Sequence, residues 1–156
     1  KADKGKALFA AKSCVMCHNV GGHFGAGAFG PDLTHLASRK SLAGAWLGGQ
    51  RGALLMQSSG IGNCINMLGT IRECRFPLLT IVTMRGEWGE FNPWQLPMGQ
   101  STAKVLDDVG VVVNHVNDAA LVGETVFAAA MMAFQTCRPV AVLIGQRVVG
   151  FKDWSK

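Results

Sequence analysis

The sequence predicts an α/β chain in two parts: an N-terminal helical segment over residues 1–42, then a truncated four-stranded parallel sheet with flanking helices over residues 43–156. Two observations carry this prediction. Beyond residue 43, short apolar runs alternate with helical periodicity, which is the pattern of a parallel sheet with right-handed crossovers. Before it, a cysteine and histidine motif and a glycine-rich stretch dominate, and the character of the sequence changes over residues 41–44.

Composition and charge exclude several classes of protein. The chain is 49% apolar and 16% charged, which is typical of globular proteins. Residues 1–42 hold six basic and two acidic residues, a net charge of +4, whereas residues 43–156 hold nine and eight, a net charge of +1. The basic segment could attract an acidic redox partner protein or the negative haem propionates, or it is simply a solvated helix face. No basic run is interleaved with aromatics, so no nucleic acid is expected, and no apolar run approaches the roughly 18 residues of a membrane span.

The N-terminal segment begins with a short amphipathic helix predicted over residues 4–13. Ala7, Leu8 and Ala11 fall on one side of it, and its lysines fall mostly on the other. A glycine-rich loop is predicted over residues 19–30, because five of these twelve residues are glycine. Such a loop disfavours regular structure and suits close wrapping of a flat ligand.

Between these two segments lies a CxxCH motif formed by Cys14, Cys17 and His18. Two thiols three positions apart on one helical turn can form thioethers with the vinyl groups of a haem, and the adjacent imidazole then reaches the iron from the same side. A zinc site or a redox-active CxxC pair is the alternative, although no second CxxC or HxxxH follows to complete a zinc site. The motif therefore predicts covalent haem c, with His18 as the proximal iron ligand.

Residues 5 to about 42 resemble the start of a class I cytochrome c domain, particularly the kind fused to subunit two of bacterial cytochrome c oxidases. The resemblance rests on GxxxF before CxxCH and on GPDLTH followed by Ser-Arg. The matching positions are Gly5, Phe9, Cys14, Cys17, His18, Gly30, Pro31, Leu33, His35, Ser38 and Arg39. It implies that the carbonyl of Pro31 orients the second ring nitrogen of His18, and that Leu33 packs on the haem.

The sixth iron ligand stays open. A complete domain of that family continues to a methionine that supplies this ligand and then to a closing helix, and neither follows here. His35 and His23 are the candidates within the segment. Met56 and Met67 lie on a predicted strand and helix, where a methionine usually belongs to the core.

Beyond residue 43 the predicted elements follow the order of an α/β fold. Strands are predicted over residues 53–57, 77–84, 110–116 and 139–144, and helices over 42–47, 61–73, 101–109 and 118–137. Ser101 and Asp118 are the expected first residues of the last two helices. Residues 85–100 are expected to form a long loop, and residues 145–156 an irregular tail. Four strands are few for an independent domain, so an open edge, a homo-oligomer or a partner subunit is expected.

Candidate polar residues follow the first two predicted strands. Ser58, Ser59, Gly60 and Asn63 lie at a strand-to-helix turn, where they could line a cofactor or anion site or provide ordinary turn and capping contacts. Arg85, Glu87 and Glu90 could contact an acidic substrate, but a solvated loop is the expectation. The cysteines outside the motif, Cys64, Cys74 and Cys137, are odd in number and are expected to be buried and reduced.

A second resemblance covers residues 43 to about 154. The runs AGAW at 43–46, MQSSGIGN at 56–63, PLL at 77–79, MRGE at 84–87 and PMG at 97–99 resemble the alpha subunit, or pyrimidine-binding domain, of sulfopyruvate and phosphonopyruvate decarboxylases. Those enzymes use thiamine diphosphate, which implies that cofactor here, with its magnesium supplied by a partner. The family's cofactor-activating glutamate lies shortly before the segment that matches Ala43, and here Ser38 to Leu42 contain no carboxylate.

The sequence therefore predicts a composite protein that binds haem c covalently and transfers electrons. The alternatives are a subunit of a thiamine diphosphate-dependent decarboxylase and a chimeric folding-test protein with neither activity, so enzyme activity stays open. Haem attachment implies a periplasmic or other extracytoplasmic location, and the decarboxylase interpretation implies a cytoplasmic one. A natural recombinant, an engineered chimera and an assembly error are all compatible with the sequence.

Overall fold

The computed structural model describes residues 44–150 of the chain. Contacts between residues divide the chain into two units, Lys1–Ser41 and Leu42–Lys156, and the account below concerns the second. The predicted helix at residues 4–13, the glycine-rich loop and all the predicted haem-binding residues lie outside the described residues. The predicted helix at residues 42–47 is described in part, and residues 44–47 are helical.

The second unit is built on a four-stranded parallel sheet in the order β1-β2-β4-β3. The strands are β1 (Ala53–Gln57), β2 (Leu78–Thr83), β3 (Val112–Val116) and β4 (Pro139–Ile144). All three neighbouring pairs are parallel, and the register of the central pair places Leu78 opposite Pro139. The predicted fold class is confirmed, and all four strands lie where the sequence predicts them.

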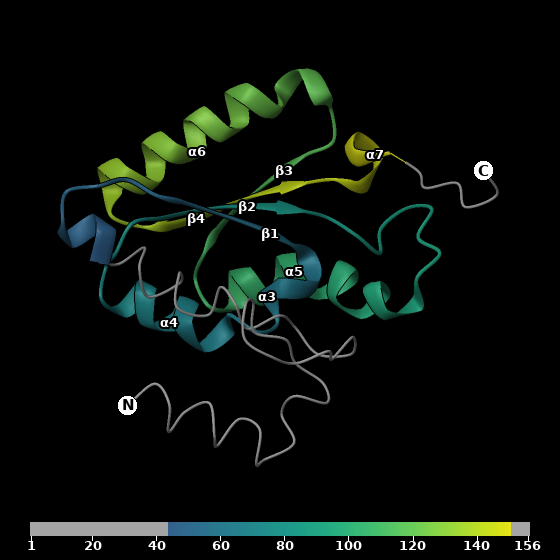
Figure 1. Cartoon of the computed structure of the whole chain (residues 1–156), viewed down its shortest axis with the longest axis horizontal. Helices are drawn as coiled ribbons and strands as arrows, with labels where there is room; N and C mark the ends of the chain where they lie inside the picture. Colours follow the sequence, from purple (N-terminus) through teal and green to yellow (C-terminus); the bar gives the residue numbers. More distant parts are fainter. Residues whose placement is uncertain (1–43, 151–156) are drawn as a thin grey trace, which may run out of the picture. The chain divides into compact units, whose positions relative to one another are not determined.

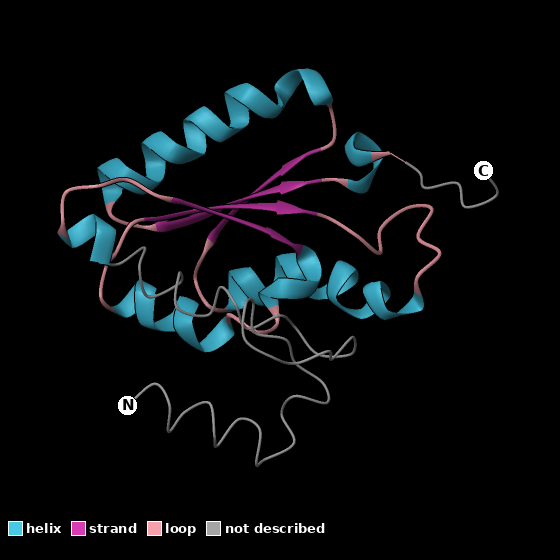
Figure 2. Cartoon of the chain, in the orientation of Figure 1, coloured by secondary structure: helices cyan, strands magenta, loops and turns pink. Residues whose placement is uncertain are grey.

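Helices cover both faces of this sheet (Figures 1 and 2). The short α3 (Ser58–Ile61), α4 (Ile65–Glu73) and α5 (Leu96–Asp108) lie on one face, and α6 (Val122–Thr136) lies on the other. Two short 3₁₀ helices, η2 (Pro93–Gln95) and η3 (Ala119–Leu121), precede α5 and α6, and α7 (Gln146–Val149) follows β4. The unit therefore has three layers, with the sheet in the middle.

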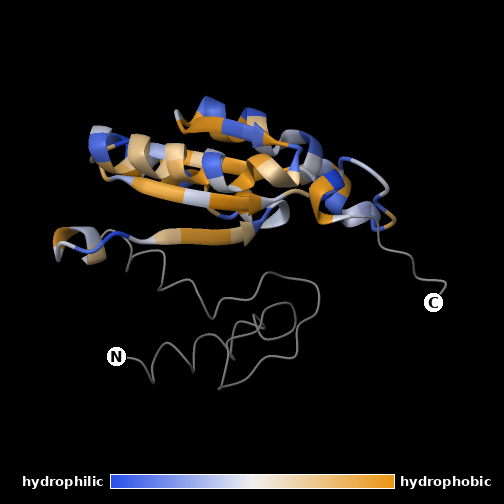
Figure 3. Ribbon diagram, turned by 90° about the horizontal axis from the view of Figure 1, so that it is seen from above, coloured by the Kyte–Doolittle hydropathy of each residue, from blue (hydrophilic) through white to orange (hydrophobic). Residues whose placement is uncertain are grey.

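The two faces of the sheet carry separate apolar clusters. One joins α3, α4 and α5 to the sheet through Ile61, Leu68 and Leu106, and the other joins α6 to the sheet through Ala129 and Ala133. Five of the six residues of β4 are buried, as expected for a strand that is covered on both faces. The strands accordingly appear largely hydrophobic in Figure 3, whereas the helices alternate between hydrophobic and hydrophilic residues.

The strand β1 forms one edge of the sheet and is less protected than β4. Its first four residues alternate between exposed and half-buried, and Leu55 is 71% exposed. Among the described residues β1 pairs with β2 alone. The sequence expectation of an open sheet edge is thus met within this part of the chain.

The largest difference from the sequence prediction lies between β2 and α5. Residues 85–100 were expected to be a loop with a helix starting at Ser101, yet η2 begins at Pro93 and α5 begins at Leu96. Pro97 occupies the first turn of α5, where a missing backbone N–H costs no helical hydrogen bond. Proline therefore marks the start of this helix, whereas it was interpreted as evidence for a loop.

Three smaller boundaries also differ. The helix predicted over residues 61–73 is divided, since α3 ends at Ile61 and α4 begins at Ile65. Asp118 caps η3, since its Oδ1 accepts a hydrogen bond from the N–H of Ala120 at 2.9 Å, and α6 itself begins at Val122. The predicted irregular tail contains the one-turn helix α7 directly after β4.

The expectation for the cysteines is wrong in two of three cases. Cys64 is buried as predicted, but Cys74 is exposed and Cys137 is half-buried, and these last two are free thiols. Cys74 and Cys137 both follow the last residue of a helix, and such helix ends lie at the protein surface.

One apolar run among the described residues does reach the length of a membrane span, but a single such helix is weak evidence for a span. The 18 residues Ala119–Thr136, which comprise η3 and α6, reach that length with a mean hydropathy of 1.3, and 11% of them are buried. In the structure one side of α6 packs on the sheet through Ala129 and Ala133, while Phe127 is 68% exposed. By length and composition alone, this helix is one candidate for a membrane span among the described residues.

Candidate functional site

A small pocket opens at the carboxyl ends of the parallel strands, where ligands bind in open α/β sheets. Gln57 ends β1, Thr83 ends β2, and Gln146 directly follows the loop after β4. These three residues line a cavity of about 200 Å³ together with Arg85, Gly89, Phe91, Val149 and Gly150. The topology of the sheet thus brings side chains from three separate parts of the sequence to one place.

Arg85 lines this pocket and forms a buried ion pair with Glu90. The Arg85 Nε and Nη2 atoms donate to the two carboxylate oxygens of Glu90 at 2.6 and 2.7 Å. The Glu90 side chain is 2% exposed and that of Arg85 is 15% exposed. A two-point contact of this kind fixes the orientation of both planar groups, so the loop after β2 is held in a defined shape.

Backbone and amide donors complete the environment of Glu90. Its Oε2 accepts from the N–H of Gly86 and its Oε1 from the N–H of Asn92, at 3.2 and 3.0 Å. Chiefly because of the hydrogen bonds from Arg85, the pKa of Glu90 is lowered to about 2, and the same contact raises the pKa of Arg85. The Glu90 carboxylate is therefore charged and fully engaged within the protein.

Gln146 connects this loop to the end of β4. Its Oε1 accepts from the N–H groups of Glu87 and Trp88 at 3.0 and 3.1 Å, and its Nε2 donates to Glu90 at 3.1 Å. Its backbone N–H donates to Glu87 Oε2 at 3.0 Å. Because Gln146 is 4% exposed and every polar atom of its side chain is used, it acts as a fixed clamp on residues 87–90.

The turn after β1 is tied to the same loop through Ser58. This residue is fully buried, and its Oγ accepts from the N–H of Arg85 at 3.1 Å. The hydroxyl of Thr102 on α5 donates to the backbone carbonyl of Met98 at 2.5 Å. It also lies 3.4 Å from the backbone carbonyl oxygen of Ser58. The turn, the loop and α5 are therefore locked together around the pocket.

Close backbone contact between α5 and the loop requires glycine at one position. A Cβ atom on Gly99 would overlap the carbonyl oxygen of Arg85 and lie 2.7 Å from the Cα of Gly86. Gly86 itself has a φ of +76°, in the left-handed region that favours glycine. These two glycines allow α5 to pack directly against the residue that carries the ion pair.

The structure brings together part of the candidate residues from the sequence. Arg85, Glu87, Glu90 and Ser58 belong to one network, so the expectation of a solvated loop is wrong for Arg85 and Glu90. Asn63 is exposed, and Ser59 donates to Gln57 Oε1 at 3.3 Å. Met56, Met67 and Met98 pack against the apolar core as partly buried residues, as expected for Met56 and Met67.

Sequence reasoning missed Gln146, because it lies in the predicted irregular tail. The position of Gly145 and Gln146 directly after a buried strand was the signal that could have identified it. The predicted haem residues Cys14, Cys17, His18, Pro31 and Leu33, with His23 and His35, lie outside the described residues. Within residues 44–150, no group of three or more His, Cys, Asp or Glu side chains is arranged to hold a metal ion.

The pocket fits the thiamine diphosphate implied by the second resemblance only in part. Its volume and its two amide side chains, Gln57 and Gln146, suit a small polar ring. The nearest buried carboxylate is Glu90, and its hydrogen bonds to Arg85, Gly86, Asn92 and Gln146 leave it unable to activate a cofactor. The residues described here therefore do not supply the chemistry that the cofactor requires.

Comparison with known proteins finds two kinds of similarity in the chain. Residues 2–54 match the family model for cytochrome c. This match includes the CxxCH motif and extends past the predicted junction at residue 42 into β1.

The remaining similarity is to decarboxylases. Sulfopyruvate decarboxylase subunit alpha from Methanothermobacter thermautotrophicus is 34% identical over 103 residues, or 65% of this chain and 62% of that protein. The subunit alpha from Methanococcus maripaludis is 46% identical over 69 residues, 44% of this chain and 41% of that protein. Phosphonopyruvate decarboxylase from Streptomyces viridochromogenes is 37% identical over 111 residues, 69% of this chain and 28% of that protein.

The chain thus spans less than two thirds of the length of these relatives. Two relatives are named as subunit alpha, a name consistent with a multi-subunit assembly. This chain is a two-part composite, in which a segment that matches cytochrome c precedes a segment similar to sulfopyruvate decarboxylase alpha subunits.

Proposed function

We propose that this composite protein binds haem c covalently through its N-terminal segment and transfers electrons. The observation that carries the proposal is the CxxCH motif at Cys14, Cys17 and His18, inside a segment that matches the cytochrome c family. A bound haem c supplies one-electron chemistry at its iron. In the proposal, Cys14 and Cys17 hold the porphyrin, His18 ligates the iron, Pro31 orients His18, and Leu33 packs on the ring.

The test is the production of the full chain in a host with haem-maturation machinery. The proposal expects an intact mass raised by one haem that resists denaturation, together with a c-type absorption spectrum. An unmodified mass, with the spectrum of the unmodified protein, contradicts it. Attachment also implies export from the bacterial cytoplasm, so the haem-loaded protein is expected in the periplasmic fraction.

The sixth iron ligand is addressed by three matched variants. We expect either His35→Ala or His23→Ala to change the iron from low spin to high spin in the absorption spectrum. The control is His115→Ala, because His115 is exposed on β3 within the other unit of the chain. A spectrum that is unchanged in both His35→Ala and His23→Ala assigns the ligand elsewhere or indicates an open position.

A second candidate function is a subunit of a thiamine diphosphate-dependent decarboxylase that acts on sulfopyruvate or a similar 2-oxo acid. It is favoured by the similarity to alpha subunits and by a pocket at the carboxyl ends of β1, β2 and β4. The engaged state of Glu90 and the lack of a carboxylate in residues 38–42 argue against turnover. Within this candidate function the chain contributes binding surface, and a partner subunit supplies the diphosphate and magnesium site.

Two measurements separate binding from turnover in this second function. Calorimetry of the chain with a partner subunit, magnesium and thiamine diphosphate detects binding. Gln57→Met in the pocket is expected to weaken this binding. The control is Gln135→Met on the exposed part of α6, which is expected to leave it unchanged. Carbon dioxide release from sulfopyruvate in the same mixture measures turnover. No binding in that mixture would eliminate this function, and binding without turnover would limit the chain to a binding role.

Association with another protein chain through the α/β part is also proposed. It is supported by the open edge at β1 and by exposed apolar side chains on α6, including Phe127 at 68% and Met132 at 41%. Light scattering distinguishes a self-associated homo-oligomer from a monomer that requires a partner subunit. A monomer that does not bind a partner subunit contradicts this proposal.

A further inference from the structure

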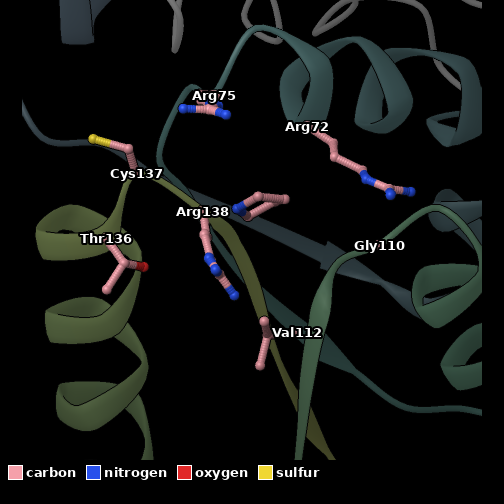
Figure 4. A pocket seen from close by; sticks show the side chains of 8 residues that line it. Arg72, Arg75, Gly110, Val112, Thr136, Cys137 and Arg138 are labelled. Atoms are coloured by element: carbon pink, nitrogen blue, oxygen red, sulfur yellow. The ribbon is translucent and has the colours of Figure 1, made fainter.

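A second and larger cavity lies at the opposite, amino end of the sheet. Its volume is about 520 Å³, and its walls come from the ends of α4, α5 and α6 and from the beginnings of β3 and β4. Three arginines, Arg72, Arg75 and Arg138, line it together with Thr136. Figure 4 shows these side chains around the open space, with Arg138 between the elements that carry the others. Neither proposed function uses this cavity.

The charge of this cavity is one-sided. No aspartate or glutamate is among the residues that line it. Arg72 approaches Glu73 at 3.9 Å, but both side chains are exposed, by 55% and 81%, and such a pair contributes little. Within residues 44–150, Arg75 and Arg138 take part in no ion pair. This contrasts with Arg85, whose charge is matched by a buried carboxylate.

The C-termini of the neighbouring helices offset only part of this positive charge. The C-terminus of a helix carries about half a negative charge, and basic side chains often stabilise it. Three helices, α4, α5 and α6, end at this cavity, so their combined dipoles offset about half of the three guanidinium charges. The lining residues therefore keep a net positive charge, and the carboxylates of Glu73, Asp107 and Asp108, which are close to them in sequence, do not line the cavity.

The backbone leaves room for one of these arginines and turns sharply beside the other two. Gly110 has a φ of +78°, and a Cβ atom there would lie 2.7 Å from the Cδ of Arg72. Arg75 follows α4 with a φ of 53°, and Cys137 ends α6 with a φ of 52°, directly before Arg138. Two of the arginines therefore leave their helices at sharp left-handed turns beside the cavity.

We propose that this cavity binds a multivalent oxyanion of the phosphate class. A guanidinium group presents a planar fork of donors that matches two oxygens of a phosphate. In Figure 4 the three guanidinium groups are spread around the space and do not converge on a single point. An anion with two phosphoryl groups, such as inorganic pyrophosphate, can contact two of them at once, whereas orthophosphate contacts one.

The test is isothermal titration calorimetry of the full chain with inorganic pyrophosphate and, separately, orthophosphate, at one low ionic strength. We expect pyrophosphate to bind more tightly than orthophosphate. Arg75→Gln and Arg138→Gln should each weaken pyrophosphate binding about tenfold, since each removes a charge-assisted contact. The double variant should show no measurable binding. Both side chains belong to exposed residues, so thermal unfolding of the variants should match that of the unsubstituted chain.

Arg147→Gln is the matched control, because it removes the same charge at the other end of the sheet. Arg147 follows β4 and lies over the ring of Trp88, with its Cζ 4.8 Å from the ring centroid. This variant should retain the pyrophosphate affinity of the unsubstituted chain. The proposal is overturned if the unsubstituted chain binds no pyrophosphate or if the double variant binds it with undiminished affinity. It is also overturned if Arg147→Gln weakens pyrophosphate binding as much as the cavity variants do.

Discussion

The groups proposed to attach haem lie within five consecutive residues, Cys14 to His18, whereas the hydrogen-bond network beside the pocket of the α/β part joins residues as distant as Glu87 and Gln146, 59 positions apart. The first kind of chemistry is encoded by local spacing and needs little of the surrounding chain. The second exists only when the sheet aligns the carboxyl ends of β1, β2 and β4. The two parts should therefore respond independently to mutation, and the predictions below test that independence.

The largest effect is expected from replacing both cysteines of the motif. Cys14→Ser combined with Cys17→Ser should abolish covalent haem completely, because no thiol remains to form a thioether. Intact mass and absorption spectra measure this loss. Cys74→Ser is the control, since Cys74 is an exposed free thiol in the other part of the chain, and it should leave haem attachment unchanged. Haem retained by the double variant would show that attachment does not use the motif.

A large effect on the α/β part alone is expected from Gly99→Ala. The added methyl group would overlap the backbone of Arg85, which cannot move without disrupting the ion pair, so unfolding should become easier by about 3 kcal/mol. Denaturant titration followed by circular dichroism measures this change. Gly69→Ala on α4 is the matched control, because nothing lies within 4 Å of its added Cβ, and it should stabilise the fold by about 1 kcal/mol. Equal midpoints for the two variants would refute the packing described at Gly99.

Glu90→Gln should destabilise the α/β part by about 3 kcal/mol, since it leaves the Arg85 charge without its carboxylate. Glu73→Gln should change stability by less than about 0.5 kcal/mol, because that carboxylate is exposed and its ion pair is weak. Both values come from denaturant titration at neutral pH. Haem content should be the same in both variants, and a drop in Glu90→Gln alone would show that the two parts are coupled.

The smallest expected effect is a pH dependence of stability due to Glu90. Its pKa falls from an ordinary 4.5 to about 2 on folding, so the carboxylate favours the folded state whenever it is charged. This contribution should be fully present above about pH 4.5 and should decline as the pH falls toward 2. As the pH is lowered across this range, the free energy of unfolding should fall more steeply for the unsubstituted chain than for Glu90→Gln. Parallel pH profiles would contradict the assigned pKa.

The sequence predicts the strands well because each is a short apolar run with clear punctuation. The predicted ranges 53–57 and 139–144 coincide with β1 and β4. The start of α5 was missed because Pro97 has two meanings: it ends many helices, and it is also favoured in their first turn. Local pattern does not choose between these two meanings, and the packing of Gly99 against the loop does.

The site was harder to predict than the fold. Arg85 and Glu90 lie in a polar stretch whose composition is typical of a solvated loop, and only tertiary structure removes them from water. Gln146 holds the loop after β2 because β4 ends beside that loop. Its position directly after a buried strand marks it as a candidate, but the sequence does not show which loop lies beside it. The arginines of the amino-end cavity are likewise dispersed over residues 72–138 and meet only in the fold.

Limited proteolysis of the haem-loaded chain, followed by mass spectrometry of the fragments, tests most directly whether this is a two-part composite with separate chemistries. The account predicts a resistant fragment that begins near residue 43 and carries no haem, and a separate peptide that contains Cys14 and Cys17 with haem attached. A resistant fragment that retains the haem and extends through both parts would contradict it, as would the loss of any resistant fragment.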